Sequence, residues 1–142
     1  MSFCQAILHS FAGLSDKKGA PWRTLLAVSA NSITAVEAAL RAAREANCPI
    51  FFAATLNQVD ADGGYTGWDH CSFVAAARQA AKRIGFKGPI LLGVDHAGPW
   101  LKDKHSNERW PYSRTLAAVK RSLASAIEAG FDLLHIEPTV DI

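Results

Sequence analysis

Four short apolar runs, each separated from the next by an amphipathic stretch, constrain the fold of this chain more than any other feature. The runs are continuously apolar and do not alternate with polar residues, which is typical of parallel strands buried on both faces. Strands that alternate with helices predict an α/β fold with right-handed crossovers. We expect four parallel strands in sequential order, with the helices outside, over residues 24–30, 49–56, 89–95 and 131–137.

The amphipathic stretches between the runs predict helices, and their ends carry recognisable caps. Asn31 or Ser32 can accept hydrogen bonds from the free N–H groups at the start of the first helix, and Asp69 can do so for the second. Gly85 is a typical C-terminal stop. We expect helices over residues 31–47, 70–85 and 113–130, a leading helix over 3–19 and a solvated loop over 100–110.

Length and charge exclude several classes of protein. A chain of 142 residues can form one domain with a real core, and no linker divides it. The net charge of +2 is small and scattered, which argues against a nucleic-acid partner, and no apolar run reaches the roughly 20 residues of a membrane helix. The three cysteines include no CxxC pair, so we expect free buried thiols in a reducing cytoplasm.

The third apolar run ends on Asp95 and His96, and Gly98 and Pro99 follow one residue later. Neighbours in a regular strand point to opposite faces, so both side chains can serve one site only if the strand has ended. Function in parallel α/β folds lies at the carboxyl ends of strands. The pair is therefore a candidate site, and the alternative is a capping Asp beside a hydrogen-bonded His.

The fourth run carries a second pair, His135 and Glu137, whose side chains share one face because they are two residues apart. Glu137 stands at the carboxyl end of the strand, where barrel carboxylates often face a site. The alternative is a hydrogen-bonded polar pair at the barrel rim, the edge that the carboxyl ends of the strands form. The other histidines, His9, His70 and His105, have no spacing that suggests partnership, and we expect them at the surface.

The second run opens into the long polar loop NQVDADGGYTGW. Its amides, Asn57 and Gln58, suit sugar hydroxyls, and Gly63 and Gly64 permit positive φ and close backbone approach to a ligand. We favour a ligand-facing loop over a simple turn. Ser29 and Asn31 end the first strand on the same rim, where substrate contact and helix capping are equally good explanations.

The strings NQVDADGGYTG, GVDHAGP and LLHIEPT, with AVSANS ahead of them, resemble the GatZ/KbaZ-like family of D-tagatose-1,6-bisphosphate aldolase subunits. The resemblance implies a (β/α)8 barrel related to class II aldolases, with Asp95 as the proton shuttle at the C4 hydroxyl of the substrate and His96 as a metal ligand. The match covers only these two residues, and Glu137 is a second candidate catalytic carboxylate from its place at the carboxyl end of the fourth run. Zinc is the implied metal in a full-length homologue.

A closed barrel of this kind needs on the order of 250 residues, so we expect this chain to be the N-terminal half of one, with a leading helix over 1–20 and four βα units over 21–142. One imidazole and one carboxylate do not make a zinc centre, which normally takes three protein ligands. We therefore expect no tightly bound metal, and self-association through the open edges.

The resemblance leaves three functions open. The family's subunit is described as non-catalytic, and it supports the activity and stability of a separate class II aldolase chain in ketose-phosphate catabolism. A metal-dependent ketose-phosphate 4-epimerase would use the same Asp and His. A truncated chain without activity is the third. The family's older label, tagatose-6-phosphate kinase, finds no support, because the sequence holds neither GxxxxGK[ST] nor GxGxxG.

Overall fold

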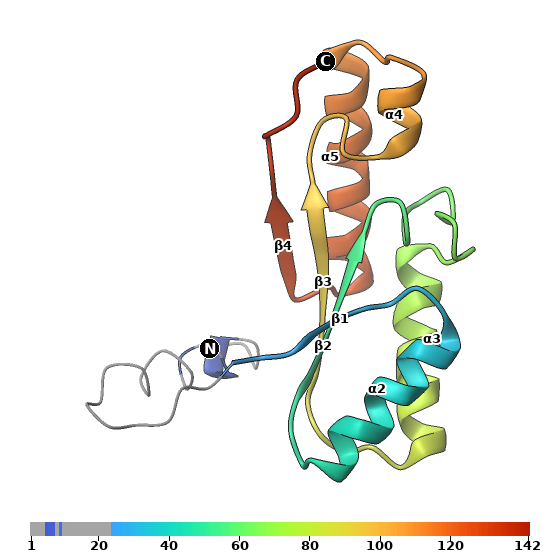
Figure 1. Ribbon diagram of the computed structural model, residues 1–142, viewed down its shortest axis with the longest axis vertical. Coiled ribbons are helices and arrows are strands. Elements are labelled where there is room, and N and C mark those ends of the chain that lie inside the picture. Colours follow the sequence, from blue (N-terminus) through green and yellow to red (C-terminus); the bar gives the residue numbers. More distant parts are fainter. Residues whose placement is uncertain (1–4, 8, 10–23) are drawn as a thin grey trace.

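The computed structural model describes residues 5–7, 9 and 24–142. Its four strands form one parallel sheet in the order β1-β2-β3-β4, as the sequence predicts (Figure 1). The elements are β1 (Ala27–Ser29), α2 (Ile33–Glu45), β2 (Ile50–Thr55), α3 (His70–Ile84), β3 (Ile90–Ala97), α4 (Asp103–Asn107), α5 (Tyr112–Ala129) and β4 (Leu133–Ile136).

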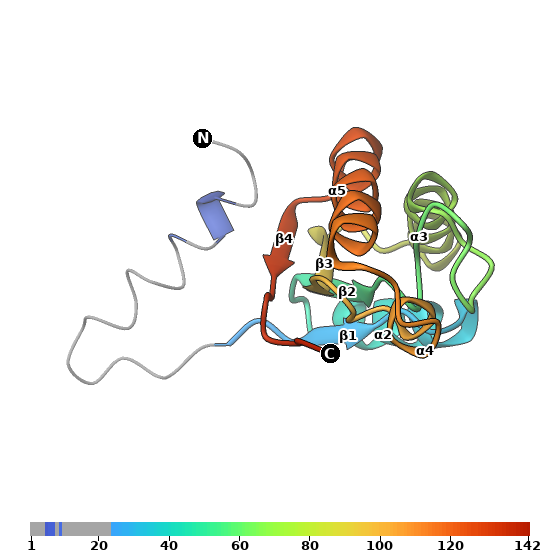
Figure 2. The same cartoon turned by 90° about the horizontal axis from the view of Figure 1, so that it is seen from above.

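The long helices α2, α3 and α5 lie on one side of the curved sheet (Figure 2). Phe52 and Leu92, which lie side by side in the register of β2 and β3, pack there with Leu40 of α2 and Phe73 of α3 in the main core. Alternating residues such as Phe51 point to the opposite face, which these helices leave uncovered. The fold therefore has a helix-covered outer face and an open inner face.

The helix ends follow the predicted capping chemistry. Ser32 is the N-cap of α2, and its side chain accepts a hydrogen bond from the N–H of Ala35 at 3.2 Å. Asp69 caps α3 in the same way, with Ser72 N–H as the donor at 2.7 Å. Gly85 ends α3 in the left-handed region, with φ of 72°. Of the two cap candidates for the first helix, Ser32 is thus the one used.

Several boundaries differ from the prediction. β1 has three residues and pairs with β2 in the described sheet, so it is shorter than predicted. β3 continues to Ala97, and the predicted loop over 100–110 contains the short helix α4.

Cys48 and Cys71 are free, as expected, but exposed. The predicted leading helix lies largely outside the described residues. Its described residues, 5–7 and 9, are helical. Among the described helices, none has the length and apolarity needed to cross a membrane.

Candidate functional site

An irregularity in β3 brings Asp95 and His96 to the same side of the sheet. Val94 pairs with Leu134 and Ala97 pairs with Ile136, so two residues of β3 lie opposite the single residue His135 of β4. Such a β-bulge inserts one extra residue and re-aims the side chains next to it. His96 takes a left-handed conformation with φ of 52°. The strand therefore does not have to end for both side chains to serve one site, contrary to the prediction.

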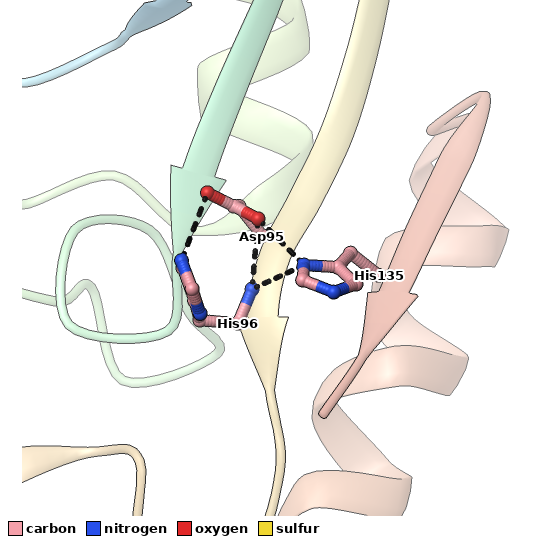
Figure 3. Close-up of side chains that lie close together, drawn as sticks. All are labelled: Asp95, His96 and His135. Atoms are coloured by element: carbon pink, nitrogen blue, oxygen red, sulfur yellow. Dashed lines mark hydrogen bonds and ion pairs between the residues drawn. The ribbon is translucent and has the colours of Figure 1, made fainter. Parts of the chain in front are cut away.

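Asp95 holds the imidazole of His135 across the strand pair (Figure 3). The Nδ1 atom of His135 lies 2.8 Å from Asp95 Oδ1, and the backbone N–H of His96 donates to the same oxygen at 3.1 Å. The rings of His96 and His135 meet edge to face, with centroids 5.3 Å apart. Sequence reasoning placed His135 beside Glu137 but missed its contact with Asp95, because the bulge sets the register that creates it.

The second contact at this rim joins His96 Nδ1 to the carboxylate of Glu137. This hydrogen bond and the charge of Asp95 raise the pKa of His96 above its ordinary value of 6.5. A hydrogen bond from Thr139 Oγ1, at 2.6 Å, and the contact with His96 lower the pKa of Glu137 below 4.5. The pair is thus most stable with His96 protonated and Glu137 ionised.

The sign of the pH dependence follows from these shifts. Because the pKa of His96 is raised in the folded chain, the contribution of His96 to folding stability is complete below about pH 6.5. It is lost as the pH rises through the raised pKa. Because the pKa of Glu137 is lowered, its contribution is present above about pH 4.5 and is lost as the pH falls through the lowered value. The contact is therefore strongest between these two limits.

We expect Glu137→Gln to move the pKa of His96 down toward 6.5, because the main cause of its elevation is removed. Titration of the histidine Cε1 protons by NMR measures this directly. Glu128→Gln, which removes an exposed carboxylate from α5, serves as the control and should leave His96 unchanged. A His96 titration that is the same in wild type and Glu137→Gln would show that the contact is absent in solution.

Asp95, His96 and His135 have the donor set of a transition-metal site. One ligand atom from each lies within 4.8 Å of the others. The Nδ1 atom of each imidazole contacts a carboxylate, Asp95 for His135 and Glu137 for His96. Metal-binding histidines use one ring nitrogen in this way, which orients the other nitrogen for the metal. These residues fit a zinc ion in chemistry, although His96 and His135 are about half exposed.

The loop that follows β2 folds against the segment that follows β3. Asn57 accepts a hydrogen bond from the N–H of Asp103 at 2.9 Å and donates to the Asp103 carboxylate at 3.0 Å. Gln58 is buried, and its Oε1 accepts from the N–H of Thr55 at 2.9 Å. The amides of Asn57 and Gln58 thus hold the loop in shape, and substrate contact by either of them stays a prediction.

Two glycines shape the tip of this loop. Gly63 and Gly64 have φ of 92° and 50°, as the predicted positive-φ backbone requires. A Cβ on Gly64 would lie 2.3 Å from the carbonyl oxygen of Gln58, so the close approach is one that only glycine permits. Contact of Gly63 or Gly64 with a ligand stays a prediction.

Ser29 and Asn31 lie at the far side of the same rim, at the end of β1. Both are exposed, and Asn31 donates its N–H to the carbonyl of Ser29 at 3.0 Å. Because β1 is separated from β4 by two strands, Ser29 stands away from Glu137 within one copy of the described sheet. Their role toward a substrate stays a prediction.

A buried ion pair fastens the loop to the rim. Lys102 Nζ lies 2.5 Å from Asp60 and 2.7 Å from Asp62, and Lys102 and Asp60 are only 6% and 5% exposed. Burial acts to lower the pKa of Lys102, but hydrogen bonds and charge from both aspartates outweigh it and raise that pKa. The predicted solvated loop is therefore anchored at its start.

Two histidines expected at the surface are buried, which corrects the prediction. His70 is 1% exposed, and its Nδ1 contacts Ser125 Oγ at 3.1 Å. His105 is 4% exposed, bonds Thr115 at 2.9 Å and stacks on Trp110. Burial lowers the pKa of each, so both favour the neutral form. The polar character of histidine favoured the surface, but each of these rings is buried beside a hydroxyl partner from α5. His9 is exposed, as expected.

The chain is similar to a known protein family and to a solved structure. Residues 14–142 match the model of the family described as D-tagatose-1,6-bisphosphate aldolase subunit GatZ/KbaZ-like. The chain is also similar to a solved structure, a probable tagatose 6 phosphate kinase from Sinorhizobium meliloti 1021, with 31% identity and a TM-score of 0.70. That match covers 83% of this chain and 30% of the other, so the chain spans less than a third of that protein's length.

Proposed function

This chain belongs to the D-tagatose-1,6-bisphosphate aldolase subunit GatZ/KbaZ-like family, and from that premise we propose that it acts as a non-catalytic subunit that supports a separate class II aldolase chain. The family match over residues 14–142 is the observation that carries the proposal. The substrate of the assembly would be a ketose bisphosphate, and the place of action the cytoplasm. Support would consist of higher activity and a longer lifetime of the catalytic chain.

The test combines this chain with a purified class II tagatose-bisphosphate aldolase encoded in the same genome. We expect the mixture to keep its cleavage activity longer at raised temperature than the aldolase alone, with triose phosphate release measured in a coupled assay. An Asp95→Asn variant should support equally well, because the proposed role is non-catalytic. Equal lifetimes with and without this chain would reject the proposal.

The rim geometry favours a second candidate, a ketose-phosphate 4-epimerase that acts by retro-aldol cleavage and re-addition on the other face. The carboxylate of Asp95 would accept the proton of the C4 hydroxyl as the C3–C4 bond breaks, and would return it when the bond re-forms. Glu137 would hold the imidazole of His96, and Asp95 that of His135, in fixed orientation. A zinc ion held by His96 and His135 would supply a Lewis acid for the substrate carbonyl.

The two candidates separate in one assay without any aldolase present. An epimerase would interconvert tagatose 6-phosphate and fructose 6-phosphate, followed by NMR, and Asp95→Asn would abolish the conversion. A supporting subunit would leave both sugars unchanged. The same reaction mixture with added aldolase then shows whether support occurs independently of epimerisation.

We expect this chain to bind zinc only weakly and to cleave no ketose bisphosphate by itself. Three donors at a rim that is about half exposed lack the dry, closed surroundings in which zinc sites gain affinity. Calorimetric titration should give a dissociation constant in the micromolar range or weaker. His135→Ala should weaken this binding further, whereas His9→Ala should not. Submicromolar zinc binding that disappears in His96→Ala would contradict the expectation.

A further inference from the structure

Two buried histidines stand on either side of the loop over residues 57–68, which follows β2. His70 begins α3 directly after this loop, and His105 lies in α4, which the loop contacts through Asn57 and Asp103. The two histidines are only 1% and 4% exposed. The candidate site at the rim uses neither of them. An imidazole is the side chain whose charge changes most readily near neutral pH, so a buried pair at this loop calls for an explanation of its own.

His70 fits its surroundings only in the neutral form. Its Nδ1 atom contacts Ser125 Oγ at 3.1 Å, and its ring meets that of Phe131 edge to face, with centroids 5.3 Å apart. Its Nε2 atom is buried and has no hydrogen-bond partner among the described residues. A protonated ring carries an N–H on both nitrogens, so the Nε2–H of a charged His70 would be a buried donor without an acceptor.

His105 is held by a hydroxyl group that also suits a neutral ring. Its Nδ1 atom lies 2.9 Å from Thr115 Oγ1, and that oxygen accepts the N–H of Trp100 at 3.2 Å. Thr115 is fully buried, and its hydroxyl can donate its own hydrogen to Nδ1. A proton on Nδ1 would turn this acceptor into a donor and would leave the hydroxyl hydrogen without a partner.

Fixed charges act on both rings, but burial has the larger effect. The charged groups that act on one or both histidines are Asp60 and Asp62 of the loop, Asp69 before α3, Lys102 before α4 and Arg114 of α5. The ion pair of Lys102 with Asp60, which fastens the loop, acts on both rings. Desolvation is the largest cause for each, and it lowers the pKa of both histidines below 6.5.

These contacts place a group that resists protonation on each side of the loop. We propose that His70 and His105 make the attachment of residues 57–68 and α4 sensitive to acid, so that mild acid releases both while the strands stay paired. The release is local because β2 and β3 pair over six residues in the core, whereas α4 has five residues and no side-chain cap. The proposal is independent of whether the chain supports an aldolase.

The direction of the pH effect is opposite to that of His96. A histidine whose pKa is lowered by folding contributes stability that is complete above about pH 6.5. This contribution is lost as the pH falls from about 6.5 through the lowered pKa. The carboxyl groups of Asp and Glu usually titrate near pH 4, so a change seen between about pH 7.5 and about pH 5 reports mainly on histidines.

Hydrogen exchange at these two pH values, with each rate corrected for the intrinsic effect of pH, tests the release. The N–H of Tyr65, which donates to the carbonyl of Asn57 at 2.8 Å, reports on the loop. The N–H of Trp110, which donates to the carbonyl of His105 at 2.9 Å, reports on the end of α4. We expect the protection of both to fall roughly tenfold or more at the lower pH, since one unit of pKa shift corresponds to tenfold. The buried amides of α2 should keep their protection.

Glutamine variants show whether the two histidines cause the effect. His70→Gln and His105→Gln each keep a polar side chain that cannot be protonated, so each should lose part of the pH dependence and the double variant nearly all of it. His9→Gln, at an exposed position, should behave like the wild type. Equal protection of Tyr65 and Trp110 at both pH values, or a pH dependence that survives in the double variant, would overturn the proposal.

NMR titration of the histidine Cε1 protons in the wild type gives a readout that needs no variant. We expect His70 and His105 to titrate below pH 6.5 and over the same pH range in which the loop loses protection. This comparison decides the matter if the double variant does not fold. Titration of both histidines at or above pH 6.5 would also overturn the proposal, because folding would then not resist their protonation.

Discussion

Replacement of Lys102 with Met is expected to lower the free energy of unfolding by about 3–5 kcal/mol, because it leaves a buried carboxylate without its cation. Asp60 is 5% exposed, and Lys102 Nζ, 2.5 Å away, is its partner in the ion pair. Met keeps most of the length of the lysine stem, so the loss is mainly one of charge. The free energy of unfolding of a small domain is about 5–15 kcal/mol in total, so the variant should be barely stable.

Matched variants separate the buried charge from the loss of a lysine. Lys104→Met removes an exposed lysine two residues away and should change stability by less than about 0.5 kcal/mol. Asp60→Asn combined with Lys102→Met should be more stable than Lys102→Met alone, because no uncompensated charge is then buried. Urea denaturation followed by circular dichroism measures all three.

Two results would contradict this account of Lys102. One is a loss in Lys102→Met no larger than that in Lys104→Met, which would mean that the pair is solvated in solution. The other is a double variant that is less stable than the single one. The same network shapes the loop after β2, since Asp60 and Asp62 both belong to it. A loosened loop would therefore accompany the loss of stability.

The strands and long helices could be predicted from the sequence because local signals and burial agree in them. Continuous apolar runs mark β2 and β3, the two central strands of the sheet, most of whose residues are buried. Asp69 and Gly85 mark the ends of α3 through chemistry that acts within one turn. The parallel sheet followed from the apolar runs, and the family followed from strings that lie within the residues its model matches.

Tertiary contacts explain what the sequence did not reveal. The helix α4 has five residues and no side-chain cap, and it is held by contacts such as Asn57 to Asp103 from a loop 46 residues away in the chain. The pairing of His135 with Asp95 depends on a bulge that no local pattern signals. Buried His70 and His105 likewise depend on partners from α5.

Gly98 links the sequence motif to the geometry of the rim, and Gly98→Ala is expected to cost about 3 kcal/mol or more. A Cβ at this position would lie 1.8 Å from the carbonyl oxygen of Glu137, which is backbone and cannot rotate away. Overpacking of this kind typically costs about 1–3 kcal/mol, and more where the neighbour cannot move. Glycine is thus required at position 98 because the backbone of Glu137, directly after β4, passes against it.

The substitution should also disturb the site, because a shift of the backbone at Glu137 away from Gly98 would relieve the clash. The N–H of Glu137 donates to the carbonyl of Ala97 at 3.1 Å, and the Glu137 carboxylate contacts His96. We therefore expect the pKa of His96 to fall toward 6.5 in Gly98→Ala, measured by NMR under conditions where the variant is folded.

Gly85→Ala is the matched control for Gly98→Ala. Its Cβ would meet nothing within 4 Å, but its φ of 72° is strained for any residue with a side chain, at a cost of about 1–2 kcal/mol. The control should thus lose less stability and keep the raised pKa of His96. Equal losses in the two variants, or an unchanged His96 titration in Gly98→Ala, would mean that β3 and β4 are not in the close contact that assembles this rim.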